Sequence, residues 1–369
     1  MKIGTLPNGG DAIKAANELF KGLLEKGIVE ELMAPAVQPG GSCSLALFAD
    51  AERLDPILPW APVMPVQGGR ALSKLAFTDP GVKTGVVLRP CEARASVELI
   101  KLKQIVPDNI LFITVDCPGT CEVAAFKASG VDEVEGAKTL LSGKVPEGNN
   151  LRTACSICEN PAAEVGEIRI HIFGGGDVAI EAEDEVATKL EEAEVVTFSG
   201  AGIAGRDEAV KALKAERVKA RDELFAKFDD ETGSLEKLKE AFSTCIRCYN
   251  CMENCPICYC KVCIFKSPTF EHTGDKYAAW AMRKGVQKLP TETMLFHMTR
   301  LNHMSSSCIG CGVCDTACPM GLPVATLFRK VAKGVQEMFE YQPGRSLDDD
   351  IPLSVFREDE LQAESGSGK

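Results

Sequence analysis

The order of apolar and polar residues predicts the first element of the chain. Within residues 10–33, the apolar side chains of Leu19, Phe20, Leu23 and Ile28 recur at roughly helical spacing. We therefore expect this segment to form one amphipathic helix.

Short apolar runs then alternate with segments of helical pattern. The runs are bounded by Gly, Pro or Asp, as strands often are, and lie at residues 44–50, 84–90, 109–116 and 167–176. The helical segments between them lie at residues 68–77, 91–104 and 121–130. Strands that alternate with helices are typical of a mostly parallel sheet with helices on both faces. The pattern predicts an α/β domain with a mostly parallel sheet.

A charged segment follows this domain. Residues 205–230 are rich in Ala, Lys, Glu and Arg, which is typical of a solvated helix, and a second helical segment, "LEKLKEAF", leads into a cysteine-rich region. The predicted organisation is an α/β domain (1–203), a helical connector (204–244), a cysteine-rich domain (245–335) and a C-terminal tail (336–369). The final "AESGSGK" is expected to be disordered.

Composition and charge narrow the class of protein. The chain is 45% hydrophobic and 25% charged, as globular proteins are, and no apolar stretch approaches the roughly 20 residues of a membrane span. Its first residues lack the zones of a secretion signal, so we expect a cytoplasmic protein with reduced thiols rather than a disulfide-stapled secreted one. The formal net charge of −12 disfavours a nucleic-acid partner.

Eight of the 17 cysteines form two copies of the pattern C-x2-C-x2-C-x3-C-P, which is the bacterial ferredoxin spacing for paired 4Fe–4S clusters. In such pairs the fourth cysteine of each motif binds the other cluster. The expected ligands are Cys245, Cys248, Cys251 and Cys318 for one cluster, and Cys308, Cys311, Cys314 and Cys255 for the second. A zinc scaffold is the alternative, but structural zinc favours separated pairs of ligands. We expect a ferredoxin-like α+β domain with two 4Fe–4S clusters.

A second group of cysteines falls in the α/β domain. Cys91 and Cys117 each follow a predicted strand, and parallel strands would place both at the carboxyl edge of the sheet. Cys155 and Cys158 add a C-x2-C pair. From spacing alone, these four residues are either the ligands of a further 4Fe–4S cluster or unrelated free thiols.

Three further cysteines lack a fourth partner. The segment C-Y-C-x2-C contains Cys258, Cys260 and Cys263. These cysteines either hold another cluster together with Cys121 or Cys43, or replace members of the α/β set as cluster ligands. They are alternatively structural thiols. Two histidines lie near the second ferredoxin motif: His297 and His303 are either packed or solvated residues, or cluster ligands or proton carriers.

Two glycine-rich turns are candidates for cofactor binding, because such turns let a backbone approach a phosphate. One contains Gln67, Gly68 and Gly69 before a predicted helix, and the other contains Gly174, Gly175 and Gly176 after a predicted strand. Neither carries the G-x-G-x-x-G fingerprint, and each is alternatively a plain turn.

The segments "LRPCEARASVELIKLKQ", "VDCPGT", "CSICENPAAEVGEI", "CIRCYNCMENCPICYCKVC" and "CIGCGVCDTACPMGLPVATLF" resemble the beta subunit of cytosolic formate dehydrogenases. That subunit belongs to the wider coenzyme F-420 hydrogenase/dehydrogenase beta-subunit family, and the likeness runs over nearly the whole chain. The resemblance implies FAD in the α/β domain next to a 4Fe–4S cluster, which favours a cluster at Cys91, Cys117, Cys155 and Cys158. It also implies a partner catalytic subunit of formate dehydrogenase or hydrogenase type, or heterodisulfide-reductase-like subunits.

The leading hypothesis is therefore an oxidoreductase subunit, active only with partner subunits, that passes electrons between a catalytic partner, 4Fe–4S clusters and FAD. The alternative is a relay without a flavin or an acceptor of its own. No residue of this chain is expected to be catalytic, because the cofactors carry the chemistry.

Overall fold

The centre of the computed structural model, which describes residues 1–355 except 7–9, 176–177, 201, 271 and 286–291, is a seven-stranded sheet. Its strand order is β1-β7-β6-β5-β4-β2-β3. The strands are β1 Lys2–Leu6, β2 Glu31–Val37, β3 Cys43–Phe48, β4 Thr84–Leu88, β5 Ile110–Val115, β6 Ile168–His171 and β7 Val178–Ala182. The central strands β2, β4, β5 and β6 are parallel, while the pairings of β3, β7 and β1 are antiparallel. The predicted parallel sheet is confirmed for its core, and its edges make it mixed.

Helices cover both faces of this sheet, as the alternation of segments predicted. Helices α1 (Ala12–Glu25), α5 (Glu133–Leu141) and α7 (Asp184–Glu192) share one apolar core with Val87 of β4. Helices α2 (Gly68–Leu75) and α3 (Pro90–Lys101) share the other with Val86 and Leu88. Neighbouring residues of β4 thus point to opposite faces, as the two-residue period of a strand requires.

The first predicted helix is shorter than expected. Instead of running through residues 10–33, α1 ends at Glu25, and the chain turns at Gly27, whose φ of 66° favours glycine. Residues 31–37 form β2, which lies between β3 and β4 and is almost entirely buried. A strand buried on both faces shows an apolar run without alternation, so its pattern merged with that of the helix before it.

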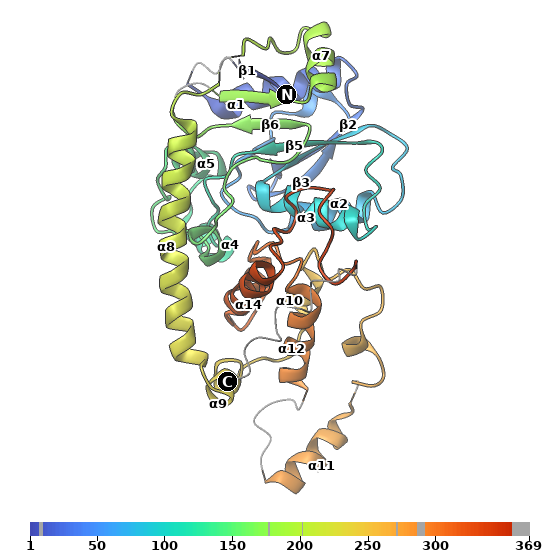
Figure 1. The fold of residues 1–369 in the computed structure, drawn as a ribbon, viewed down its shortest axis with the longest axis vertical. Coiled ribbons are helices and arrows are strands. Elements are labelled where there is room, and N and C mark those ends of the chain that lie inside the picture. The colour runs from blue at the N-terminus through green and yellow to red at the C-terminus, as the bar shows by residue number, and fades with distance from the viewer. Residues whose placement is uncertain (7–9, 176–177, 201, 271, 286–291, 356–369) are drawn as a thin grey trace.

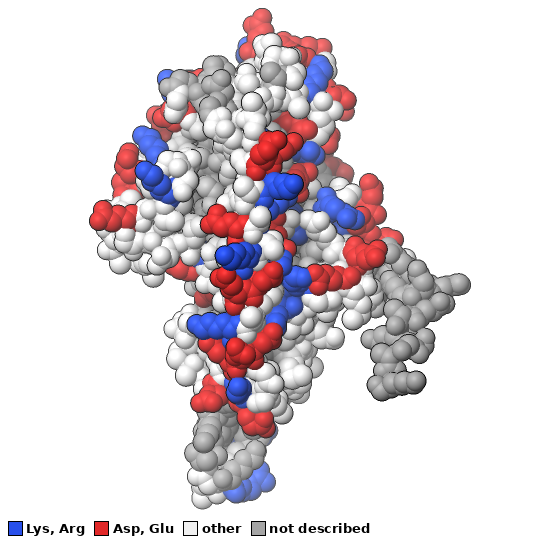
Figure 2. Space-filling model, turned by 60° about the vertical axis from the view of Figure 1, so that its left-hand side comes forward, with Lys and Arg blue, Asp and Glu red and all other residues white. Residues whose placement is uncertain are grey.

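A long helix joins the two halves of the molecule. Helix α8 (Arg206–Thr232) matches the charged segment at 205–230 and runs along one side of the molecule, from the sheet towards the cysteine-rich half (Figure 1). Acidic and basic side chains are interleaved over the face that includes this side (Figure 2). The helix is not purely solvated, because Arg217 is buried and donates from Nη2 to the carbonyl of Pro118 at 2.6 Å. After it, α9 spans Leu235–Ala241.

The cysteine-rich half differs from the expected α+β fold. Its described residues form α10 (Asn250–Glu253), the 3-10 turn η2 (Ile264–Lys266), α11 (Gly274–Lys284), α12 (Thr293–Met304), α13 (Val313–Thr316) and α14 (Val324–Met338). Within the described part of residues 245–335 there is no strand. The core here is built instead from aromatic and aliphatic side chains of α12, α14 and the cysteine turns, including Phe296 and Phe328. The expectation of strands in this domain is therefore wrong for the residues described.

The tail returns to the sheet domain. Tyr341 donates to the Glu98 carboxylate of α3 at 2.5 Å, and Arg94 of α3 donates to the carbonyl of Pro343 at 2.7 Å. The segment "AESGSGK" lies outside the described residues. Of the helices that the structure describes, none combines the length and the apolar character that crossing a membrane requires.

Candidate metal centres

Two parallel strands bring the first cysteines of the α/β set to one edge of the sheet. Cys91 lies in the first turn of α3, directly after β4, and Cys117 follows β5, which pairs in parallel with β4. Pro90 occupies the first position of α3, where its missing N–H costs nothing. The carboxylate of Glu92 closes this turn by accepting from the backbone N–H of Arg89 at 2.9 Å. The predicted edge position of both thiols is confirmed.

All four thiols of this set are neighbours in the structure. The pKa of Cys91 is raised by burial, then by the charge of Glu92 and by those of Cys311, Cys117 and Cys158. Burial raises the pKa of Cys117 to about 12, and the charges of Cys155 and Cys158 add to that increase. The four thiols therefore lie within electrostatic range of one another, and Cys311 of the second ferredoxin motif lies within that range of Cys91.

The ferredoxin cysteines form two groups that exchange their fourth members. The pKa of Cys251 is raised to about 11 by burial, and the charges of Cys245, Cys318 and Cys248 contribute to the increase. The second group lines one small cavity, whose wall contains Cys255, Cys308, Cys311 and Cys314 with Ile257, Met304 and Phe328. The last cysteine of each motif thus lies with the first three of the other motif.

The two motifs share one backbone conformation. Gly310 and Gly312 of the second motif have φ values of 74° and 71°, and the equivalent Arg247 and Tyr249 of the first have φ values of 51° and 64°. A left-handed conformation is uncommon for residues other than glycine and clusters at functional sites. At both Arg247 and Gly310 the backbone N–H donates to the thiol two residues earlier. The turn therefore aims an N–H at the sulfur, which stabilises the thiolate needed for iron binding.

Four buried arginines surround these sulfurs, and sequence reasoning missed all of them. They are Arg89, Arg94, Arg152 and Arg300. Among the described residues, no carboxylate lies within ion-pair distance of the last three. Arg300 instead donates from Nη1 to the sulfur of Cys251 at 3.2 Å. The Nη1 of Arg152 and the Nε of Arg300 have no hydrogen-bond partner among the described residues.

Buried cations require a compensating charge. A 4Fe–4S cluster with four thiolate ligands is an anion, so its presence would supply that charge. In the part of the chain that the structure describes, no three or more Cys, His, Asp or Glu side chains are arranged to hold a single metal ion. A cubane differs from such an ion, because each of its ligands binds a different iron atom.

The histidines and the C-Y-C-x2-C cysteines have distinct environments. His297 is buried and its Nε2 lies 3.5 Å from the sulfur of Cys245, whereas His303 is exposed. The pKa of Cys258 is raised to about 12, first by burial and then by the charge of Cys255, with Cys263 and Cys260 adding to it. These three cysteines therefore border the second ferredoxin group.

Cys43 and Cys121, the two candidates for a fourth ligand beside the C-Y-C-x2-C cysteines, lie in other surroundings. Cys43 donates its backbone N–H to Glu133 at 3.3 Å, and the charges that act on the thiol of Cys121 are those of Cys155 and Glu122.

The glycine-rich turns are closely packed. A Cβ on Gly68 would lie 2.7 Å from Leu88, and a Cβ on Gly69 would lie 3.0 Å from the carbonyl of Glu92. The N–H of Gly68 already donates to the Glu92 carboxylate at 2.8 Å, and Gln67 caps α2 through the N–H of Arg70. These contacts account for the glycines by the close approach of α2 and α3, so a phosphate there would compete with Glu92.

The second turn is closely packed at Gly174 but open at Gly175, which lines a cavity together with Asp11 and Ile13. A Cβ on Gly174 would lie 2.9 Å from the backbone nitrogen of Arg206, while Gly175 has open space around it. Gly176 lies outside the described residues. The flavin contacts expected at these two turns stay a prediction.

Comparisons with known proteins bear on these centres. Residues 241–322, which contain both ferredoxin motifs, match a family described as "4Fe-4S dicluster domain". The chain is 28% identical to the F420-dependent formate dehydrogenase subunit beta of Methanocaldococcus jannaschii, over 92% of this chain and 93% of that protein. It is 25% identical to the F420-dependent formate dehydrogenase 1 subunit beta of Methanococcus maripaludis, over 94% of each.

A chain of the F420-reducing [NiFe] hydrogenase complex from Methanosarcina barkeri is similar in structure, with 13% identity, a TM-score of 0.47, and coverage of 64% of this chain and 94% of that one. We draw no argument from a likeness of that size. The two curated relatives confirm the resemblance to formate dehydrogenase beta subunits, and the dicluster match supports 4Fe–4S clusters in an electron-transfer subunit.

Proposed function

We propose that this chain is the iron–sulfur flavoprotein subunit of a formate dehydrogenase or a related oxidoreductase, in which it passes electrons between a catalytic partner subunit and FAD. The observation that carries the proposal is the succession of three groups of four cysteines. The two ferredoxin groups exchange Cys255 and Cys318, and the charge of Cys311 acts on Cys91 of the third group.

The proposed ligands follow these groups. They are Cys245, Cys248, Cys251 and Cys318 for the first cluster, Cys308, Cys311, Cys314 and Cys255 for the second, and Cys91, Cys117, Cys155 and Cys158 for the third. Cys258, Cys260 and Cys263 stay candidates for a further site. The chain's own residues tune these sites, because the N–H groups at Arg247 and Gly310 and the guanidinium of Arg300 all donate to sulfur.

FAD, when bound, would exchange two electrons at once with a soluble acceptor, which iron–sulfur clusters cannot do singly. The names of the relatives make a deazaflavin the first acceptor to test. Formate oxidation itself belongs to the partner, which is a catalytic subunit of formate dehydrogenase type. A heterodisulfide-reductase-like complex is the other assembly in which the chain would fit.

A relay without flavin is the second candidate function. It is favoured by the packing of the first glycine-rich turn, where the backbone N–H of Gly68 already donates to Glu92. The cytoplasm is the proposed location for both candidates, since free thiols and clusters persist in a reducing compartment.

The test is to mix the anaerobic chain with its catalytic subunit and formate, and to follow the absorbance of the clusters and the flavin. We expect formate to bleach both only when the catalytic subunit is present. The reduced mixture should then pass electrons to a deazaflavin or to a nicotinamide, which identifies the acceptor. Cluster bleaching without bound flavin would establish the relay instead, and formate oxidation by this chain alone would overturn both candidates.

A further inference from the structure

The first residues of the C-terminal tail cross helix α3, and we call residues 341–344 the tail strap. Gly344 donates its backbone N–H to Oε1 of Glu98 at 2.8 Å, and the hydroxyl of Tyr341 donates to the same oxygen at 2.5 Å. Glu98 is fully buried and pairs with Lys101 at 2.8 Å. One buried carboxylate of α3 therefore anchors both ends of the tail strap.

The middle of the tail strap lies on Arg94, one helical turn before Glu98. Arg94 donates from Nε and Nη2 to the carbonyl of Pro343, at 3.0 and 2.7 Å. A Cβ on Gly344 would lie 2.6 Å from Cα of Arg94, and the φ of Gly344 is 72°, so only glycine lets the backbone pass this close. These contacts fix the orientation of the guanidinium, because two donors on one of its edges meet a single backbone carbonyl.

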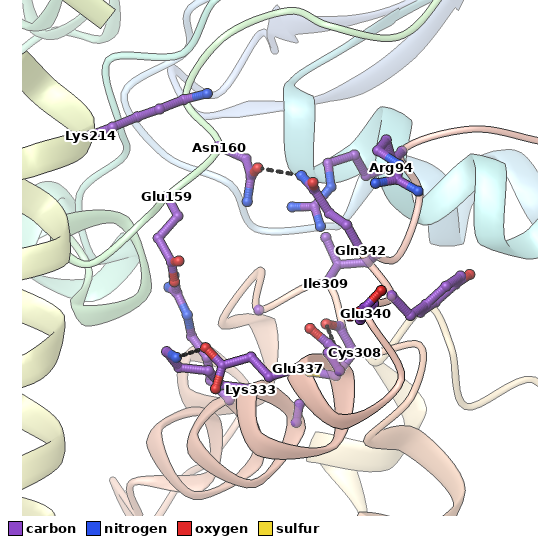
Figure 3. A pocket seen from close by; sticks show the side chains of 16 residues that line it. Arg94, Glu159, Asn160, Lys214, Cys308, Ile309, Lys333, Glu337, Glu340 and Gln342 are labelled. Atoms are coloured by element: carbon purple, nitrogen blue, oxygen red, sulfur yellow. Dashed lines mark hydrogen bonds and ion pairs between the residues drawn. The ribbon is translucent and has the colours of Figure 1, made fainter. Parts of the chain in front are cut away.

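The tail strap also reaches the loop that carries Cys158. Gln342 donates from Nε2 to Oδ1 of Asn160 at 2.9 Å, on the wall of a cavity of about 610 Å³ (Figure 3). Asn160 is two residues after Cys158, and Arg94 is three residues after Cys91 on the same helix. Residues three apart on a helix are neighbours on its surface. The tail strap therefore joins two segments that each carry a proposed ligand of the third cluster.

The cation that the tail strap holds acts on these sulfurs. Burial lowers the pKa of Arg94, and the charges of Cys158 and Cys91 act against that decrease. Arg94 is only 8% exposed. A buried cation stabilises the reduced form of a cluster, which is one charge more negative than the oxidised form, and so raises its potential. Because this interaction weakens with distance, the position of the guanidinium determines the size of the effect.

The tail strap is connected to the second ferredoxin motif as well. Helix α14 ends at Met338, three residues before the strap begins. Gln336 of this helix donates from Nε2 to the carbonyls of Ser305 and Cys308, at 2.9 and 3.0 Å. A short stretch of chain therefore links the backbone of a proposed ligand of the second cluster to the surroundings of the third.

We propose that the tail strap is a positioning device for the third cluster: it holds the guanidinium of Arg94 beside Cys91 and Cys158, and thereby sets the potential at which that cluster accepts an electron. Tyr341 and Gly344 are positioning residues that act through Arg94. The inference rests on the proposed function, because the third cluster is part of it. It gives the tail a role in electron transfer, although residues 336–369 contain no cysteine.

The test is the midpoint potential of the third cluster in the full chain, measured by anaerobic redox titration with electron paramagnetic resonance. The signal that is missing from Cys158→Ala identifies this cluster. Arg94→Gln removes the cation and should lower the potential. Gly344→Ala keeps the cation but displaces the strap, so it should cause a smaller decrease. Tyr341→Phe removes one of the strap's bonds to Glu98 and should cause the smallest decrease.

A matched control and a double variant isolate the role of the strap. Gly143→Ala is the control: the φ of Gly143 is 77° but nothing lies within 4 Å of an added Cβ, so the potential should not change. In Arg94→Gln/Gly344→Ala the strap has no cation left to position. The potential of this double variant should therefore equal that of Arg94→Gln alone, and a further decrease would overturn the inference, because the strap would then act by another route.

The inference is also overturned if Gly344→Ala and Tyr341→Phe leave the potential of the third cluster unchanged, or raise it, as the entry of water would. Iron content, measured on the same samples, separates the two proposals. About twelve irons with an unchanged potential would reject the positioning role and leave the electron-transfer function standing. Absence of the third signal from the unmodified chain would reject the third cluster of the proposed function, and the positioning role with it.

Discussion

The contact between Cys245 and His297 shows how one buried side chain can tune a cluster. Burial lowers the pKa of His297 to about 4, with the nearby Arg300 adding to the decrease, so the imidazole is neutral and its Nε2 can donate to the sulfur 3.5 Å away. Its ring also packs against Phe242, with centroids 4.8 Å apart. Hydrogen bonds to the ligating sulfurs raise the potential of a cluster, because they stabilise its more negative reduced form.

We therefore expect His297→Phe to lower the midpoint potential of the first cluster by some tens of millivolts, since a net hydrogen bond is worth about 1 kcal/mol. Redox titration followed by electron paramagnetic resonance measures this. His297→Gln keeps a donor and should restore part of the shift, and His303→Ala, on the same helix but exposed, should cause none. An unchanged potential in His297→Phe would show that the contact has no role in tuning.

Single cysteine substitutions test the exchange of ligands between the two motifs. Cys251→Ala should remove the first ferredoxin cluster and Cys314→Ala the second, each with the loss of about four irons. Electron flow should fall in both variants, whereas the proposed flavin should still bind, because we expect its site in the sheet domain. Iron analysis and flavin absorbance of the purified variants check this. Equal loss of flavin would contradict the division of the chain into separate domains.

Sequence spacing predicted that the eight ferredoxin cysteines lie in two groups, because the motif itself fixes which sulfurs are close; their roles as cluster ligands stay a prediction. Spacing was not sufficient for Arg94, Arg152 or Arg300. Arginine is usually a surface residue, so the sequence gives no reason to expect these three in the interior. Only the fold shows that they are buried beside the cysteine sulfurs. The one local signal was the repeated occurrence of Arg within "LRPCEARA", around Cys91.

At the scale of elements, the turns around the cysteines join the two halves of the molecule. Gly312, at the N-terminus of α13, packs directly against Ala154 of α6 (Thr153–Ser156). Arg152, just before α6, donates to the carbonyl of Cys311 at 3.2 Å and to Thr316 at 3.1 Å. The second ferredoxin motif is thus held against the loop that carries Cys155 and Cys158.

Gly312→Ala should separate these turns. The added Cβ would collide with Ala154, and a left-handed conformation costs a residue other than glycine about 1–2 kcal/mol. Gly321→Ala is the control, since Gly321 has a φ of 63° but nothing within 4 Å of an added Cβ. Thermal unfolding should show a larger loss of stability for Gly312→Ala than for Gly321→Ala. Equal losses would mean that the contact with Ala154 contributes nothing.

Helices and strands were predictable where their apolar residues recur with a clear period. The charged helix α8 and the strands β4 and β5 lie where the pattern indicated, because each has a long or strongly apolar signature. Strand β2 was missed, since residues 31–37 are buried on both faces and contain Pro35, which is rare in central strands. Strands in the cysteine-rich half were expected but are not found among its described residues, which form short helices and turns instead.

At the scale of the whole molecule, the first cysteine group is the one that reaches the surface. Cys248 of this group is exposed, whereas the four cysteines of the third group have intermediate exposure at the edge of the sheet. Ile246, directly after Cys245 of the first group, is an exposed apolar side chain. We therefore expect the catalytic partner to contact the first group. The exposure of the individual cysteines could not be predicted from the sequence, because only the fold shows which of them are covered.

The order of the groups predicts different effects for variants at its two ends. Cys251→Ala should prevent the catalytic partner from reducing the remaining clusters, although the small reductant dithionite still reduces them. Cys158→Ala should leave reduction of the two ferredoxin clusters by the partner unchanged. Stopped-flow absorbance of each variant mixed with reduced partner measures this. If Cys158→Ala blocks the partner as strongly as Cys251→Ala does, electrons do not enter at the exposed end.

The most direct measurement is the iron and acid-labile sulfide content of the chain purified without oxygen. Three groups of four cysteines predict about twelve irons and as many sulfides per chain, in a brown protein that dithionite bleaches. About eight irons would remove the third group from the series and detach the sheet domain from electron transfer. A colourless protein that contains zinc would contradict the proposed function altogether.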